Sequence, residues 1–91
     1  MTEKFTLITS RVFAGRARKL PKDIRRQLAN RLARLAVDPG YSSLRTSEVE
    51  SAAGDHGDRV FESQVSRRHR MTWEYGPGKR DITLRTIDCA D

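Results

Sequence analysis

Cysteine is nearly absent from this sequence of 91 residues, since Cys89 is its only one. An internal disulfide is therefore excluded, and the cysteine and the histidines lack the spacing of a zinc site. No apolar run approaches the roughly 20 residues that span a bilayer. The first four residues lack the basic segment and the apolar core of a signal peptide. We therefore expect a cytoplasmic protein that needs no metal and no cofactor and makes no membrane contact.

Hydrophobic and aromatic residues are also scarce, at 36% and 7% of the chain. These fractions suffice for one modest core but not for two. The sequence contains no internal repeat, linker or low-complexity tract that would mark a boundary between domains. It therefore predicts a single domain, residues 1–91.

The sequence is rich in positive charge, with 18 lysines and arginines against 12 acidic residues and a net charge of +6. Arginine supplies 14 of these cations, and its planar guanidinium matches phosphate and stacks on bases. Residues 1–46 carry 11 cations and 3 anions, whereas residues 47–91 carry 7 and 9. A small, basic, arginine-rich domain favours a polyanionic partner, most often nucleic acid.

The clearest structural pattern lies near the C-terminus. Residues His69 to Tyr75 alternate between large and charged side chains, which is typical of a strand with one apolar face. Residues Asp81 to Ile87 repeat this alternation less strictly, and residues 76–80 between the two segments have the composition of a turn. We therefore expect an antiparallel hairpin with one face that packs on a core and one polar face.

The rest of the chain predicts two helices and two more strands. Apolar residues recur at helical spacing from Pro21 to Val37, and a shorter helix is expected from Arg11 to Lys19, with Val12, Phe13 and Ala17 inward. Strands are expected at residues 5–9 and 60–65, while residues 41–53 remain ambiguous. The predicted fold class is α+β: a two-layer domain in which an N-terminal strand and two helices pack on one face of a small antiparallel sheet that ends in a three-strand meander.

The polar face of the hairpin carries Arg70 and Arg85 on adjacent strands. Such residues can lie within about 5–8 Å of each other, which is unfavourable for like charges unless an anion lies between them. This arrangement predicts a phosphate site. The alternative is a surface salt-bridge network of Arg70 with Glu62 and Glu74, worth less than ~1 kcal/mol per pair.

Three segments resemble a known family. They are LPKDIRRQLANRLARLAVDPGYSSLR (residues 20–45), RVFESQVSRRHRMTWEY (59–75) and DITLRTIDCAD (81–91). Together they resemble the RelE/ParE superfamily of bacterial toxins from toxin–antitoxin modules. The similarity is strongest to the YoeB-like branch, whose arginine-bearing hairpin contains a segment of the HRLVY type, as in His69-Arg70-Met71-Thr72-Trp73.

The resemblance implies roles for individual residues. Arg70 falls at the position of a phosphate-binding arginine, and Arg85 lies on a strand where several members carry another. Glu48 matches a carboxylate that acts as general base, a role that Glu62 can also fill. Where the nucleases place a histidine or tyrosine as general acid, this chain offers only Asp88 or Cys89. Further RNA contacts are expected from five basic residues: Arg45, Arg67, Arg68, Lys79 and Arg80.

The resemblance also implies an activity and partners. The first hypothesis is a toxin that cuts mRNA without a metal, acts with the ribosome and is held inactive by a cognate antitoxin. A second hypothesis is a ParE-like inhibitor that binds DNA gyrase and cuts nothing. A third is an inactive module of the same fold that binds RNA or the ribosome.

Overall fold

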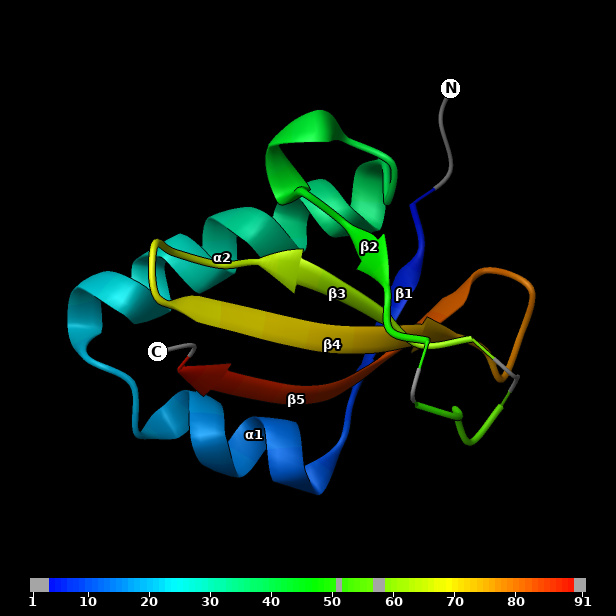
Figure 1. Cartoon of the computed structure of the whole chain (residues 1–91), viewed down its shortest axis with the longest axis horizontal. Coiled ribbons are helices and arrows are strands. Elements are labelled where there is room, and N and C mark those ends of the chain that lie inside the picture. The colour runs from blue at the N-terminus through cyan, green and yellow to red at the C-terminus, as the bar shows by residue number, and fades with distance from the viewer. Residues whose placement is uncertain (1–3, 51, 57–58, 90–91) are drawn as a thin grey trace.

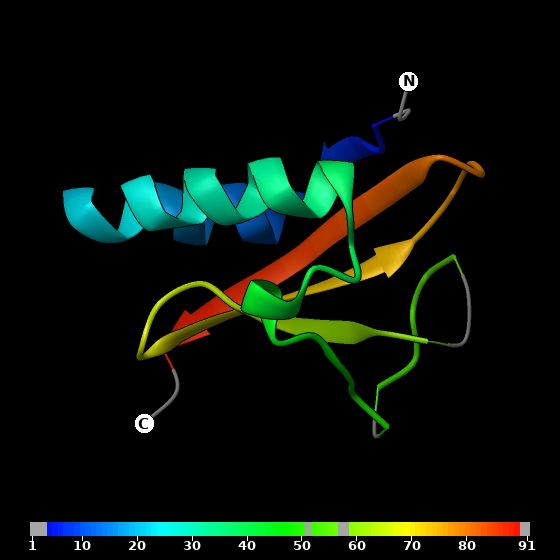
Figure 2. The same cartoon turned by 90° about the horizontal axis from the view of Figure 1, so that it is seen from above.

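In the computed structural model, which describes residues 4–50, 52–56 and 59–89, two helices lie on one face of a five-stranded sheet (Figures 1 and 2). In the described part of the chain, the other face of the sheet carries no helix. The elements in chain order are β1 (Thr6–Thr9), α1 (Arg11–Arg18), α2 (Lys22–Val37), the 3-10 turn η1 (Ser42–Leu44), β2 (Ser47–Glu48), β3 (Phe61–Gln64), β4 (His69–Tyr75) and β5 (Asp81–Cys89). This arrangement confirms the predicted α+β two-layer class.

The strand order in the sheet is β1-β5-β4-β3-β2. The pairs β2–β3, β3–β4 and β4–β5 are antiparallel, but β1 runs parallel to β5, with Thr6 opposite Asp81. The prediction of a purely antiparallel sheet was therefore wrong for β1, and the sheet is mixed. A hairpin fixes the antiparallel direction of β4 and β5, whereas no short connection constrains β1 against β5.

The helices cover the predicted apolar face of the sheet. Leu28 and Leu35 of α2 and Phe13 of α1 are buried, and they form one core with residues of β4 and β5: Met71, Trp73, Ile82, Leu84 and Ile87. Ser10 caps α1, since its side chain accepts a hydrogen bond from the Phe13 backbone N–H. Val12 was expected inward but is 51% exposed, because α1 buries only a narrow stripe.

A β-bulge in β5 explains the imperfect alternation of this strand. Thr72 of β4 pairs with Thr86 and Trp73 pairs with Leu84, so Arg85 is the extra residue. A bulge of this kind changes the phase of a strand by one residue. Leu84 and Ile87 can therefore both reach the core, while the two residues between them remain on the other face.

The ambiguous segment 41–53 contains η1 and the short edge strand β2. It is fixed by a buried polar contact with the core. Ser63 of β3 accepts a hydrogen bond from the Trp73 indole N–H (2.9 Å) and shares another with the Thr46 hydroxyl (2.6 Å). The largest aromatic side chain of the core is thus tied to the segment that leads into β2.

Replacing Ser63 with alanine should lower the free energy of unfolding by about 1–3 kcal/mol, because the buried indole N–H then loses its acceptor. Urea denaturation measures this difference, and Ser47→Ala on the exposed edge strand is the matched control. Equal stability of the two variants would show that the contact contributes nothing.

Within the described part of the chain, no helix has the length and apolar character needed to cross a membrane.

Candidate functional site

The face of the sheet opposite the helices carries a group of polar side chains from three adjacent strands. In one row, Glu62 lies opposite Thr72, which lies opposite Thr86; in the next row, Arg70 lies opposite Asp88. Rows on the same face are separated by two residues, about 7 Å. We call these five residues the open-face cluster: Glu62, Arg70, Thr72, Thr86 and Asp88.

Arg70 presents an accessible guanidinium on this face. Its side chain is 47% exposed, and its Nη1 atom lies 3.4 Å from Glu62 Oε1 in a long, exposed ion pair. Pairs of this kind contribute at most ~1 kcal/mol and are easily exchanged for another anion. The predicted pair of Arg70 and Glu62 is therefore present, and it leaves Arg70 available to a phosphate.

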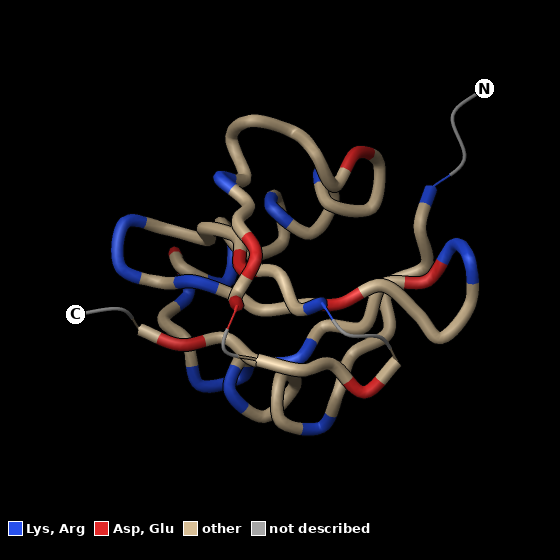
Figure 3. The backbone as a smooth tube through the Cα atoms, turned by 45° about the vertical axis from the view of Figure 1, so that its right-hand side comes forward, with Lys and Arg blue, Asp and Glu red and all other residues tan. Residues whose placement is uncertain are grey.

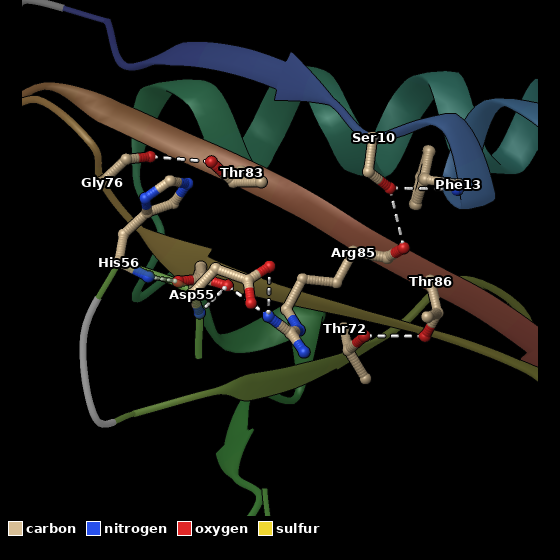
Figure 4. Close-up of polar contacts among 10 residues, drawn as sticks. Ser10, Phe13, Asp55, His56, Thr72, Gly76, Thr83, Arg85 and Thr86 are labelled. Carbon is tan, nitrogen blue, oxygen red and sulfur yellow. Dashed lines mark hydrogen bonds and ion pairs between the residues drawn. The ribbon is translucent and has the colours of Figure 1, made fainter. Parts of the chain in front are cut away.

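Two hydroxyl groups lie next to Arg70. Thr72 and Thr86 share a hydrogen bond of 2.7 Å between their side-chain oxygens across β4 and β5 (Figure 4). Alternation places Thr72 on the face of Arg70, but no pattern in the sequence shows that the bulge turns Thr86 to the same face. The two hydroxyls are neutral groups that can donate hydrogen bonds to a phosphate oxygen.

Arg85 is engaged in a different way. Its Nη1 atom forms an ion pair with Glu74, whose side chain is fully buried, and lies 3.5 Å from Asp55 Oδ2. Glu74 also accepts hydrogen bonds from the backbone N–H groups of Asp55 (3.1 Å) and His56 (2.6 Å). Figure 4 shows the Arg85 side chain directed toward this loop. The two arginines predicted to share one phosphate thus have different neighbours.

Glu74 was expected on the solvated face, and this expectation was wrong, because the loop of residues 52–56 covers its carboxylate. Burial raises the pKa of Glu74, but the hydrogen bonds from His56 and Asp55 and the contact with Arg85 outweigh it, so the pKa lies below its ordinary value. The group is therefore an anion at neutral pH, and it organises the loop.

Glu48 does not lie with the open-face cluster. It pairs with Phe61, which pairs with Trp73, so the register places Glu48 on the face opposite to Arg70. Its Oε1 atom accepts hydrogen bonds from Arg59 Nη2 (2.7 Å) and Nε (3.1 Å). This side-chain hydrogen bond lowers the pKa of Glu48, which makes the carboxylate a weaker base. Of the two expected bases, only Glu62 lies beside Arg70.

The two candidate acids lie on opposite faces of β5. Asp88 is directly across from Arg70 and forms an ion pair with Arg16 of α1. Cys89 is exposed and lies across from His69 on the other face. Arg16 engages the Asp88 carboxylate, so the cluster combines one guanidinium, one candidate base and two hydroxyls without a ready acid.

The basic residues expected to contact RNA are spread around the sheet. Figure 3 shows basic residues at both turns that flank β4. Arg67 and Arg68 lie in the turn before this strand, while Lys79 and Arg80 lie in the turn after it. The Arg80 guanidinium is also stacked over the Phe5 ring at 4.1 Å. These residues therefore lie at the two ends of β4, with the open-face cluster between them, and Arg45 lies apart from them next to β2.

The comparisons with known proteins show what this architecture is similar to. No protein-family model and no curated protein matches the sequence. Among solved structures, a chain of the archaeal RelE–RelB complex from Pyrococcus horikoshii OT3 is similar with a TM-score of 0.75 at 14% identity, covering 98% of this chain and 96% of that one. The fold is that of the RelE-type toxins. The two-layer α+β class predicted from the sequence is thereby confirmed.

Two further structures share the RelE-type fold. A chain of the intact E. coli RelBE toxin–antitoxin complex has a TM-score of 0.71 at 15% identity and covers 96% of this chain and 98% of that one. The YoeB/ParE toxin from Agrobacterium tumefaciens has a TM-score of 0.74 at 7% identity, with coverages of 94% and 99%. At such low identities the comparison establishes the fold, and the chemistry must be argued from the side chains of this chain.

Among the described residues, no group of three or more histidine, cysteine or acidic side chains is placed to hold a metal ion. The open face instead presents groups that can bind and react with a phosphodiester. These are the exposed guanidinium of Arg70, the carboxylate of Glu62 at 3.4 Å from it, and the hydroxyls of Thr72 and Thr86. A guanidinium stabilises negative charge on phosphoryl oxygens, and a carboxylate can accept a proton from a ribose 2′-hydroxyl.

Proposed function

We propose that this protein is the toxin of a toxin–antitoxin pair and that it cuts mRNA at the open-face cluster, in concert with the ribosome. The observation that carries this proposal is the exposed Arg70 guanidinium beside Glu62 on the face opposite the helices of a RelE-type fold. The fold is shared with chains of toxin–antitoxin complexes, which supports a role as the toxin of such a pair.

In the proposed reaction, Glu62 takes the proton of a ribose 2′-hydroxyl. The freed oxygen attacks the adjacent phosphorus, and the bond from phosphorus to the 5′-oxygen breaks. Arg70 and the hydroxyls of Thr72 and Thr86 stabilise the charge on the phosphoryl oxygens. The products are a 2′,3′-cyclic phosphate and a 5′-hydroxyl, so atoms and charge balance once the leaving oxygen takes up a proton from water or from a neighbouring group.

The proposed dependence on the ribosome follows from the missing acid. Asp88 is paired with Arg16, and the cluster offers no other acidic proton near Arg70 among the described residues. Correct positioning of the 2′-oxygen in line with the leaving group can compensate for such a weakness, because orientation alone accounts for several orders of magnitude in rate. A ribosome that holds the mRNA in a fixed conformation provides this orientation.

The proposed antitoxin is an amphipathic, partly disordered segment that becomes ordered when it binds. Its acidic residues would pair with exposed arginines of the open face or of α2. Occupation of the open face excludes RNA directly, whereas binding to α2 excludes it only by blocking access to the ribosome.

The test is to incubate the protein with translating ribosomes, and separately with the same mRNA alone, and to map the ends of the fragments. We expect cleavage at least about 100-fold faster on the ribosome, with 2′,3′-cyclic phosphate and 5′-hydroxyl ends. Inhibition of gyrase supercoiling without any RNA cleavage would instead favour the second function, and 5′-phosphate ends would contradict the proposed chemistry.

A further inference from the structure

A single exposed guanidinium binds a phosphate only weakly, so a second basic residue is expected to act with Arg70. The sequence suggests Arg85, but its guanidinium is only 25% exposed and is held by the buried carboxylate of Glu74. Moving Arg85 to a substrate would leave that buried anion without its cation, which is strongly unfavourable. Arg85 therefore stabilises Glu74 and the loop of residues 52–56 and is not available to bind a phosphate.

A second accessible guanidinium comes from α1. Strand β1 pairs only with residues Asp81 to Leu84 of β5, and α1 packs along the part of β5 that follows (Figure 1). Ser10 fixes the start of this helix on β5, since its backbone N–H and its side-chain hydroxyl donate to the carbonyls of Leu84 (3.1 Å) and Arg85 (2.9 Å). Arg16, in the last turn of α1, forms an ion pair with Asp88.

Asp88 pairs with Arg16, and its residue is also the strand neighbour of Arg70. It is directly opposite Arg70 on the antiparallel pair β4 and β5, where Cβ atoms are about 5 Å apart. All three side chains are about half exposed: 47% for Arg70, 49% for Arg16 and 58% for Asp88. Arg16 contacts the Asp88 carboxylate, and Arg70, on the residue opposite Asp88, makes only a long, exposed ion pair with Glu62 that it can exchange for an anion shared with Arg16.

We propose that Arg16 is the second phosphate-binding residue, and that Arg16 and Arg70 hold one RNA phosphate at the position where the Asp88 carboxylate lies in the free protein. This inference rests on the proposed function and names the groups that bind the substrate. The ion pair of Arg16 and Asp88 is exposed, so a phosphate displaces the carboxylate at little energetic expense. The carboxylate then turns toward solvent, and it lowers the affinity of the site by competing for Arg16.

The experiment measures binding of a short 2′-O-methyl RNA, which cannot be cleaved, over a range of salt concentrations. Removing one phosphate contact from a single-stranded complex lowers the slope of log K against log salt by about 0.7. We expect Arg16→Ala to show this loss of slope and about tenfold weaker binding. Arg18→Ala is the matched control, because Arg18 is on the same helix but lines the groove between α1 and α2.

The variant Asp88→Asn shows whether Arg16 binds the phosphate itself or only holds Asp88 in place. We expect this variant to bind the RNA about threefold more tightly than the unchanged protein, since a competing anion is lost. In the Asp88→Asn background, Arg16→Ala should still weaken binding about tenfold. If Arg16 only positions Asp88, then Arg16→Ala has no further effect once Asp88 is replaced.

The results for Arg16→Ala and Arg70→Ala distinguish a failure of the proposed role of Arg16 from a failure of the proposed function. A loss with Arg70→Ala but not with Arg16→Ala overturns the role of Arg16 and leaves the proposed function standing. No loss with Arg70→Ala removes the proposed function itself. Urea unfolding of each variant confirms that it is folded, and Arg16→Gln, which keeps most of the side-chain length, repeats the test if Arg16→Ala is unstable.

Discussion

Arg70→Ala is expected to reduce cleavage of ribosome-bound mRNA by about 100- to 1,000-fold, the loss typical for one preorganised donor to a developing negative charge. The stability of the protein should change by less than ~1 kcal/mol, because Arg70 makes only an exposed ion pair of 3.4 Å with Glu62. The measurement is a single-turnover cleavage rate at saturating protein, together with a urea unfolding curve.

Arg26→Ala is the matched control for this variant, since Arg26 is exposed on α2, in the layer on the other side of the sheet. It removes the same charge and should leave the cleavage rate within about twofold. Arg70→Lys keeps the charge but lacks the planar fork, so an intermediate rate is expected. Equal losses for Arg26→Ala and Arg70→Ala would show that net charge, and not the open-face cluster, determines activity.

Glu74→Gln is expected to lower the free energy of unfolding by about 3 kcal/mol. The neutral amide keeps the shape of the side chain, but it leaves Arg85 without its buried anion and faces two backbone N–H groups with only one acceptor oxygen. Glu62→Gln, on the adjacent strand and only partly buried, should change stability by less than ~1 kcal/mol. Urea denaturation at neutral pH provides the comparison.

The pH dependence of stability gives a second test of Glu74. Its pKa in the folded protein lies below the ordinary glutamate value of 4.5, so its carboxylate stabilises the fold above that pH. This contribution declines as the pH falls below 4.5 and through the folded pKa, because the folded protein must then bind a proton at a site that favours the anion. The difference between the unchanged protein and Glu74→Gln should shrink over this range. A difference that grows toward acid pH would contradict the account.

The sequence was informative about the fold because local patterns determine its elements. The helical spacing of Ile24, Leu28 and Leu35 and the alternation in β4 reflect burial against one common core. The direction of β1 could not be predicted, since its partner strand lies 75 residues away and no turn constrains it. Segment 41–53 was also ambiguous, because its structure depends on tertiary contacts such as the one between Thr46 and Ser63.

The site was predictable only in part. The position of Arg70 on the polar face follows from the alternation of β4, and its contact with Glu62 is the one that the salt-bridge alternative predicted. The engagement of Arg85 by Glu74 was not predictable, because it depends on how the loop of residues 52–56 folds over the sheet. The placement of Arg16 beside Asp88 depends on how α1 packs along β5, and neither helix periodicity nor charge spacing encodes that orientation.

The most direct test of the central claim is an NMR titration of the protein with the non-cleavable 2′-O-methyl RNA. The claim is that RNA phosphates bind the face of the sheet opposite the helices. We predict that chemical shifts change for the guanidinium of Arg70, for the neighbouring amides of β4 and β5, and for the end of α1 at Arg16. Changes confined to α2, with the resonances of β4 and β5 unmoved, would contradict the claim.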